Sequence, residues 1–167
     1  MILLKLLPSI KGDCVIKGFE DWISCTSIDW ALNREFKESS KAGSKDLFTG
    51  VAEIPPIEIA KSFDKASLNL MKFACGGGVL CPSGEILLLT TGEDMDNAKN
   101  NWYLRFKLDS PIVAKWSISG GEDERPNEKI SLWYYKIQLT YRSFDGKSFH
   151  EEGTRGWDRI GSKAWDA

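Results

Sequence analysis

Hydrophobic and polar residues alternate along much of this chain with the two-residue period of β-strands. The alternation is regular over residues 22–32, 102–109 and 112–119, and it runs longest over residues 128–142. Residues 85–91 instead contain a run of consecutive apolar residues, which is typical of a strand covered on both faces. Many strands with closely spaced turns predict a mainly β fold, a barrel or sandwich of two antiparallel sheets.

The phase of the alternation predicts which side chains face the core. Two apolar sets each share one face of a strand, Trp102, Leu104, Phe106 and Leu108 in the first and Ile112, Ala114, Trp116 and Ile118 in the second. Residues 128–142 are apolar on both faces in their first half and on one face in their second half. Apolar surface on both faces of a strand needs cover on both, so we expect part of it to contact another subunit.

The sequence pattern predicts one flanking α-helix, over residues 65–75. No proline, glycine or β-branched residue occurs from Leu68 onward, and leucine, methionine, lysine and alanine favour helix. Asp64 and Ser67 offer side-chain oxygens to the free amides of a helix start, and Gly76 is expected to end the helix in the left-handed conformation. Two apolar stripes follow from the spacing, Leu68, Met71 and Cys75 on one and Leu70, Phe73 and Ala74 on the other. Such a helix needs cover on both sides, so we expect it to lie between its own sheet and a neighbouring subunit.

Composition predicts a single globular domain over residues 1–167, with 42% hydrophobic and 28% charged residues. The 22 basic and 24 acidic residues leave a net charge of -2, without a basic stripe. Nucleic-acid binding is therefore not expected, because phosphate neutralisation needs clustered lysine and arginine. Residues 1–7 are apolar, but Pro8 ends the run well short of a signal peptide or a membrane span of about 20 residues. We predict a first strand there, with no signal peptide and no membrane insertion.

No residue pattern predicts catalysis, a cofactor or a metal site. His150 is the one histidine, and no serine or cysteine nucleophile motif accompanies it. The glycines at residues 76–78 follow the predicted helix, whereas a phosphate-binding loop precedes a helix. Glu93, Asp94 and Asp96 lack the spacing of a calcium-binding loop. We therefore expect a protein that is not an enzyme.

The four cysteines are Cys14, Cys25, Cys75 and Cys81. They form no CxxC pair, and no histidine stands at metal-ligand spacing from them. We expect reduced, buried thiols, because the chain shows no secretory leader. A disulfide between Cys75 and Cys81 is the alternative.

Residues 33–50 have neither a helical nor a strand period and are rich in charged side chains. The pattern predicts a long charged loop. Loops of this length within a compact domain are uncommon, and many are functional or ordered by a partner. The alternative is a solvated excursion without a partner.

Several segments occur in a characteristic order along the chain. They are residues 16–18 (IKG), 28–30 (IDW), 62–70 (SFDKASLNL), 119–141 (SGGEDERPNEKISLWYYKIQLTY) and 156–157 (GW). In this order they resemble the haemolysin-coregulated protein (Hcp) family, the tube protein of bacterial type VI secretion systems. The resemblance covers nearly the whole chain, although the long loop has no close counterpart in the family.

The resemblance implies a barrel of two sheets with one flanking helix, assembled into hexameric rings that stack into a hollow tube. It implies a structural subunit without cofactors, which waits in the bacterial cytoplasm and is then secreted through the type VI apparatus. The implied partners are further copies of the chain, the sheath, spike and baseplate, and small effectors held in the lumen. The alternative is a monomeric β-barrel that binds a small ligand or glycan through exposed aromatic side chains.

The resemblance also implies roles for particular residues. The residues expected to contact the next ring are Arg34, Glu35, Lys37, Glu38, Lys41, Lys45 and Asp46. Those expected at the subunit interface within a ring are Leu68, Met71, Ile130, Leu132 and Tyr134. Asp29 is expected to face the lumen.

Overall fold

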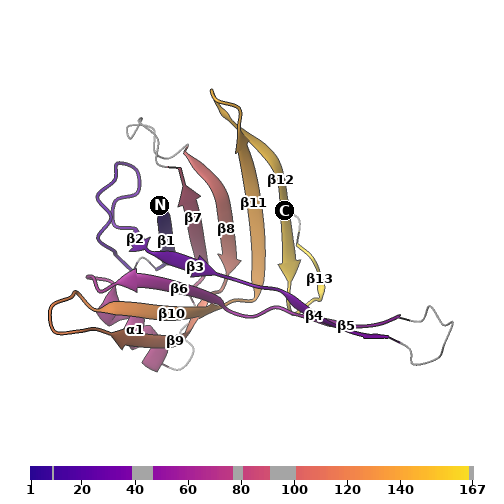
Figure 1. Cartoon of the computed structure of the whole chain (residues 1–167), viewed down its shortest axis with the longest axis horizontal. Helices are drawn as coiled ribbons and strands as arrows, with labels where there is room; N and C mark the ends of the chain where they lie inside the picture. Colours follow the sequence, from indigo (N-terminus) through magenta and orange to yellow (C-terminus); the bar gives the residue numbers. More distant parts are fainter. Residues whose placement is uncertain (9, 39–46, 77–80, 91–100, 166–167) are drawn as a thin grey trace.

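The computed structural model describes residues 1–8, 10–38, 47–76, 81–90 and 101–165. Within these residues the chain is mainly β-structure with one helix (Figure 1). The elements in chain order are β1 (Ile2–Leu7), β2 (Ile23–Cys25), β3 (Ser27–Asp29), β4 (Asn33–Glu38), β5 (Leu47–Glu53), β6 (Ile57–Ser62), α1 (Ser67–Cys75), β7 (Ser83–Leu89), β8 (Trp102–Asp109), β9 (Ile112–Ser119), β10 (Asn127–Trp133), β11 (Lys136–Phe144), β12 (Phe149–Asp158) and β13 (Lys163–Ala164).

Two antiparallel sheets make the body of the molecule. The large sheet has the strand order β13-β12-β11-β8-β7-β1-β2, and the small sheet has the order β3-β6-β10-β9. In Figure 1 the strands β7, β8 and β11 of the large sheet stand upright, while β6 and β10 of the small sheet lie across them. The predicted fold class, mainly β with antiparallel sheets and one helix, is confirmed.

The main core lies between the two sheets. Alternate residues of each strand enter it, such as Leu4 and Leu6 of β1 and Ile57 and Ile59 of β6, none of which is more than 1% exposed. Burying an aliphatic side chain of this size stabilises the fold by roughly 1.5–3 kcal/mol. The strand alternation therefore specifies the inner faces of both sheets.

A smaller apolar cluster covers the other face of the large sheet. Leu3 of β1 and Leu87 of β7 pack there against Phe19 and Trp22, whose rings meet edge to face with centroids 5.2 Å apart. Ile86, the neighbour of Leu87, enters the main core instead. β7 is thus covered on both faces, as its apolar run predicts.

Two predicted strands each prove to be two strands in different sheets. Residues 22–32 form β2 and β3, separated by Thr26, and residues 128–142 form β10 and β11, separated by Tyr134 and Tyr135. The chain crosses from one sheet to the other at these corners, as strands in crossed sheets do at a bend. The apolar–polar period runs on through both corners, so the pattern alone does not mark them.

Tyr134 holds the second corner in place. Its side chain has no exposed surface, and its hydroxyl accepts a hydrogen bond from Trp30 Nε1 at 2.7 Å. The same hydroxyl donates to the carbonyl of Pro55 at 3.0 Å. Burial raises the pKa of Tyr134 to about 12, so the hydroxyl keeps its proton at neutral pH.

Two β-bulges shift the predicted phase of β8 and β9. The register of β8 against β7 is irregular, and Trp102 packs with the smaller cluster while Phe106 lies in the main core. In β9 the bulge makes Ala114 the extra residue, so Val113 is buried and Ala114 is exposed. Placing Trp102 with Phe106, and Ala114 with Trp116, on one face is therefore wrong.

The predicted helix over residues 65–75 is confirmed as α1, which packs against β9 with Leu70 fully buried. Its predicted stop is wrong in detail. Gly76 has φ −74°, outside the left-handed region, and its amide donates to the carbonyl of Lys72 at 2.9 Å. The helix thus ends on an ordinary backbone hydrogen bond.

The four cysteines are free thiols, which excludes the alternative disulfide between Cys75 and Cys81. Cys14 and Cys81 are buried, while Cys75 is exposed at the end of α1. Burial raises the pKa of Cys25 to about 12. Cys75 is therefore the accessible thiol of α1.

The turn between β11 and β12 is built on Asp145. The Asp145 carboxylate accepts hydrogen bonds from the amides of Lys147 and Ser148, both at 2.8 Å, and it lies 2.8 Å from His150 Nε2. The backbone hydrogen bonds, with the contact to His150, lower the pKa of Asp145 to about 2. Gly146 follows with φ +92°, a conformation that favours glycine.

This turn predicts an acid dependence of stability. The pKa of Asp145 falls from its ordinary value of 3.8 to about 2 on folding, so its ionised form stabilises the fold above pH 3.8. The contribution is lost as the pH falls through that range. In urea denaturation across this range, we expect Asp145→Ala to differ most from the parent at the upper end and to converge with it toward pH 2. A constant difference would contradict this role.

Candidate assembly surfaces

β4 and β5 form a two-stranded ribbon that projects from the barrel (Figure 1). The prediction of an irregular loop over residues 33–50 is thus wrong for the described part, because Asn33 pairs with Glu53 and the ladder continues outward. The side chain of Phe36 on this ribbon is 59% exposed. An isolated two-stranded ribbon is at best marginally stable in water, so this one is a candidate for contact with another molecule.

The charged residues expected to contact the next ring lie along this ribbon. Arg34, Glu35 and Lys37 are exposed on β4, and Glu38 is its last residue. Outside the described residues lie Lys41, Lys45 and Asp46.

The side of α1 that faces away from the barrel exposes apolar side chains beside the charged Lys72. Leu68 is 65% exposed and Met71 is 39% exposed, and Cys75 is exposed beside them. Leu70 on the opposite side is fully buried. Only one of the two predicted apolar stripes is therefore covered by the chain itself.

The other three residues expected at the subunit interface lie elsewhere. Ile130, Leu132 and Tyr134 have no exposed surface and belong to the main core. They cannot contact a neighbouring subunit, so this part of the prediction is wrong. Ile130 and Leu132 lie on the inner face of β10, which the other sheet of the chain covers, while Lys129 on the outer face is exposed.

The outer face of the small sheet is polar. Asp29 of β3 is exposed there and lies opposite Glu58 of β6, which in turn lies opposite Ser131 of β10 and accepts a hydrogen bond from its hydroxyl. Asp29, Glu58 and Lys129 line a hollow of about 260 Å³ on this face. Lys115 of β9 lies opposite Ser131, so the acidic residues lie toward β3 and the basic ones toward β9.

Lys61 of β6 is fully buried, although lysine is a residue type that is almost always exposed. Its Nζ lies 2.7 Å from Asp64 Oδ1 and 3.4 Å from Glu128 Oε1. It also donates hydrogen bonds to Ser67 Oγ at 3.2 Å and to the carbonyl of Ser62 at 2.8 Å. A buried ammonium is tolerated only with partners of this kind.

The same cluster forms the start of α1. The carboxylate of Asp64 accepts from the amide of Ala66 at 2.8 Å, and the hydroxyl of Ser67 accepts from the amide of Asp64 at 2.8 Å. Both side chains thus accept from amides of the turn that leads into α1, whereas Ala66, the residue directly before the helix, has no side-chain capping bond. Since Glu128 belongs to β10, Lys61 joins β6 and the helix start to the neighbouring strand. The cluster thereby fixes the position of α1 on the barrel.

The polar groups around His150 do not form a catalytic relay. Asp145 Oδ2 at 2.8 Å and Ser148 Oγ at 3.0 Å both contact the same ring nitrogen, Nε2. A relay needs the acid and the nucleophile on different ring nitrogens. The part of the chain that the structure describes contains no group of three or more His, Cys, Asp or Glu that could hold a metal ion. No helix in that part has the length and hydropathy of a membrane span.

The fold defines a class of protein, an antiparallel β-barrel of two crossed sheets with one flanking helix and a projecting ribbon. The sequence profile of the family described as "Type VI secretion system effector, Hcp" matches residues 4–141, and the chain belongs to this family. The family comprises structural tube and effector proteins of type VI secretion and not enzymes. Membership implies that the chain is secreted by that system.

Solved structures share the fold across the whole chain. A protein described as a type six secretion system protein is 24% identical with a TM-score of 0.85, over 98% of each chain. Hcp1 from Salmonella typhimurium is 23% identical with a TM-score of 0.73, over 98% of this chain and 97% of that one. A type VI secretion system effector from Yersinia pestis is 18% identical with a TM-score of 0.70, over 95% and 99%. No curated protein matches the chain.

Proposed function

We propose that this chain, as one barrel domain over residues 1–167, is the structural subunit of a type VI secretion tube. It assembles into hexameric rings, and the rings stack into a hollow tube. The observation that carries the proposal is the apolar side of α1, where Leu68 and Met71 are 65% and 39% exposed on the single chain. Large apolar side chains that gather on one exposed face are typical of a surface that binds another protein. A contact between two different patches gives a ring when its rotation closes.

In this assembly the polar face of the small sheet lines the lumen. Asp29 stands on that wall, together with the short side chains of Ser27 and Ser117, all of them exposed. A wall of charged and hydroxyl groups stays hydrated and lets a folded protein lie against it without unfolding. Small effectors are the proposed cargo of this lumen.

The β4–β5 ribbon makes the contact between stacked rings. It projects beyond the barrel and carries the exposed Phe36 among charged residues of both signs, including Arg34, Glu35 and Lys37. A ribbon that is marginal by itself gains stability when a neighbouring ring covers it. Stacking then places the ring inside the sheath, with the spike and baseplate at its end.

Deleting residues 39–44 tests this role, although they lie outside the described residues. We expect the variant to form rings of unchanged mass but to stack and to be secreted less well, because a connection between strands tolerates deletion better than a core strand. Electron microscopy measures tube length, and immunoblotting of culture medium measures secretion. A variant that is unfolded or monomeric would show instead that residues 39–44 support the barrel.

The proposed route begins in the bacterial cytoplasm and ends outside the cell through the type VI apparatus. The apolar residues 1–7 do not act as a cleavable leader in this scheme. Most of them form β1, which lies between β7 and β2 in the large sheet, with Leu3, Leu4 and Leu6 fully buried. Removing this strand would open both apolar clusters.

The alternative is a monomeric module that binds a small ligand or glycan. Trp133 and Trp157 line a cleft of about 730 Å³ at the base of the ribbon, and Trp157 is 38% exposed. A sugar stacks on a free aromatic face. The guanidinium of Arg159 lies 4.7 Å from the Trp133 ring centre, and the Tyr135 ring packs against Trp133 at 4.7 Å. Trp133 is thus already occupied, which favours the tube subunit.

Sedimentation velocity of the purified chain separates the two functions. A ring sediments with about six times the mass of one chain, because cyclic symmetry fixes the number of subunits. A monomeric module sediments at 18.8 kDa. Only the 18.8 kDa species at micromolar concentration would exclude the tube subunit.

A further inference from the structure

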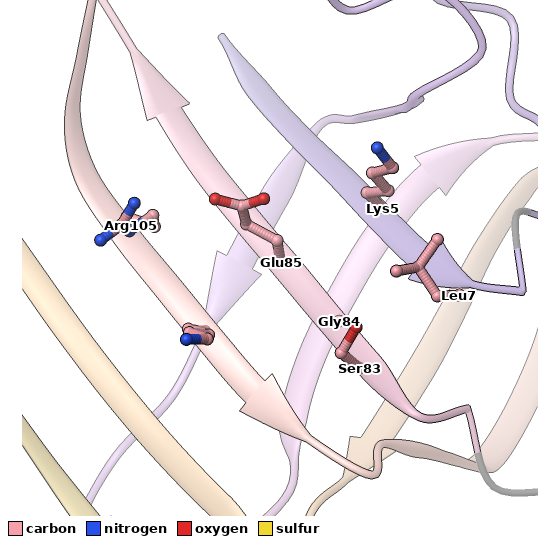
Figure 2. Close-up of a pocket in the computed structure, with 7 residues that line it drawn as sticks. Lys5, Leu7, Ser83, Gly84, Glu85 and Arg105 are labelled. Carbon is pink, nitrogen blue, oxygen red and sulfur yellow. The ribbon is translucent and has the colours of Figure 1, made fainter. Parts of the chain in front are cut away.

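The outer face of the large sheet carries a basic hollow that none of the surfaces above uses. Lys5 of β1, Glu85 of β7, and Arg105 and Lys107 of β8 line it, and its volume is about 220 Å³. Figure 2 shows the side chains of Lys5, Glu85 and Arg105 on the same face of neighbouring strands. Three cations therefore surround one carboxylate.

The cations are held in position by the sheet and by aromatic rings. Lys5 lies opposite Glu85 in the ladder, and Glu85 lies opposite Lys107, so one carboxylate stands between two ammonium groups. Lys5 Nζ lies 5.4 Å from the Trp22 ring centre, and the Arg105 guanidinium lies 4.9 Å from that of Trp102. The hollow keeps an excess of two positive charges, whereas the whole chain has a net charge of -2.

A complementary acidic feature lies at the outer end of the small sheet. The turn between β9 and β10 carries Glu122, Asp123 and Glu124 in succession, followed by Arg125, and all four are exposed. In Figure 1 this turn forms a free end of the molecule. None of the ion pairs within the described residues involves Glu122, Asp123 or Glu124. The turn therefore presents an excess of two negative charges on a projecting hairpin.

We propose that this acidic turn of one copy docks into the basic hollow of a second copy. The two features are opposite in sign and equal in size of charge, and one projects while the other is concave. A hollow of about 220 Å³ accommodates one or two carboxylate side chains but not a folded element. Because the two patches differ, the contact is head-to-tail and repeats from copy to copy. The inference rests on the proposed self-assembly, and it adds the residues that orient one copy on the next.

Charge reversal and charge exchange test the pairing. Lys5→Glu with Lys107→Glu changes the net charge of the hollow from +2 to −2, and Asp123→Lys with Glu124→Lys changes that of the turn from −2 to +2. Each of these two variants is expected to weaken association roughly tenfold or more at low salt, because like charges then meet across the contact. Both sets of changes in one chain, or an equimolar mixture of the two variants, are expected to restore it. The control is Lys147→Glu, the same charge reversal at an exposed residue of the β11–β12 turn.

Sedimentation at low and high salt measures the association, and thermal denaturation confirms that every variant is folded. High salt is expected to weaken association of the parent and to strengthen that of the charge-reversed variants, since it screens the attraction in the first and the repulsion in the second. If the parent assembles and both charge-reversed variants associate as strongly as the parent, the inference is overturned. The tube proposal would not be affected by that result. The inference would also be overturned if the single-surface variants associate less well and neither the combined variant nor the equimolar mixture restores association. The hollow would then bind a different anion. A parent that stays monomeric would overturn both.

Discussion

Replacing Lys61 by methionine is expected to lower the free energy of unfolding by about 3–5 kcal/mol, the usual cost of leaving buried charges without their partner. The Nζ atom of Lys61 is the shared partner of Asp64 at 2.7 Å and Glu128 at 3.4 Å. The side chain of Glu128 is fully buried, and its oxygens accept no hydrogen bond in the described part of the chain. Without Lys61, its negative charge is uncompensated. Urea denaturation followed by tryptophan fluorescence measures the change.

Lys65→Met is the matched control for this substitution. Lys65 precedes the helix and pairs with Asp21 at 3.1 Å, but its side chain is 50% exposed. An exposed pair of this kind contributes at most about 1 kcal/mol. Lys61→Met combined with Glu128→Gln is expected to recover part of the lost stability, because the second change removes the unpaired charge. Equal small effects of Lys61→Met and Lys65→Met would show that the buried cluster does not support the fold.

Introducing glutamate at Leu68 and Met71 is expected to abolish ring formation and to leave the single chain folded. Both side chains are exposed in the single chain, so the substitution costs the barrel little. In the proposed ring the same positions are covered, and a buried, unpaired carboxylate would oppose association. We expect the dissociation constant to rise by on the order of 100-fold or more, as at the centre of a protein interface. Sedimentation velocity gives the assembly state, and thermal denaturation gives the stability of the chain.

Asn69→Glu serves as the control, since Asn69 is exposed on α1 but is not part of the apolar stripe. Cys75 supplies an independent reading of the same surface, because it is an exposed free thiol at the end of the stripe. A thiol reagent should modify Cys75 slowly in the parent assembly and rapidly in the double variant. If the variant with glutamate at both Leu68 and Met71 still forms rings of normal mass, α1 does not take part in the subunit contact.

The alternation of side chains carries information on burial but not on the identity of the covering chain. The apolar pattern on both faces of residues 128–134 predicts Ile130 and Leu132 at a subunit interface, yet both lie in the main core. Leu68 and Met71 follow an equally apolar pattern and remain exposed. The two pairs differ only in whether another segment of the chain packs against them in the fold. The local sequence pattern contains no information on such distant packing partners.

Hydrophobic alternation also fails to predict the structure of polar segments, because they lack the apolar side chains that would reveal a period. The consecutive residues 33–37 of the β4–β5 ribbon are all exposed, so no alternation of apolar and polar side chains distinguishes β4 from a loop. Lys61 follows Ile57 and Ile59 at the inward phase of β6, which was the one available sign of its burial. Its partner Glu128 lies on another strand, and their proximity depends on the pairing of β6 with β10. Buried charges need partners that are distant in sequence, so sequence reasoning rarely finds them.

The sequence by itself determined the strand-rich fold, the place of α1 and the resemblance to the Hcp family. Each of these depends on neighbouring residues, through side-chain period and helix propensity, or on ordered motifs. Only the tertiary structure decided where strands pass from one sheet to the other and which apolar face stays uncovered. Those features follow from the pairing and packing of segments far apart in the chain, and short-range patterns contain no record of them.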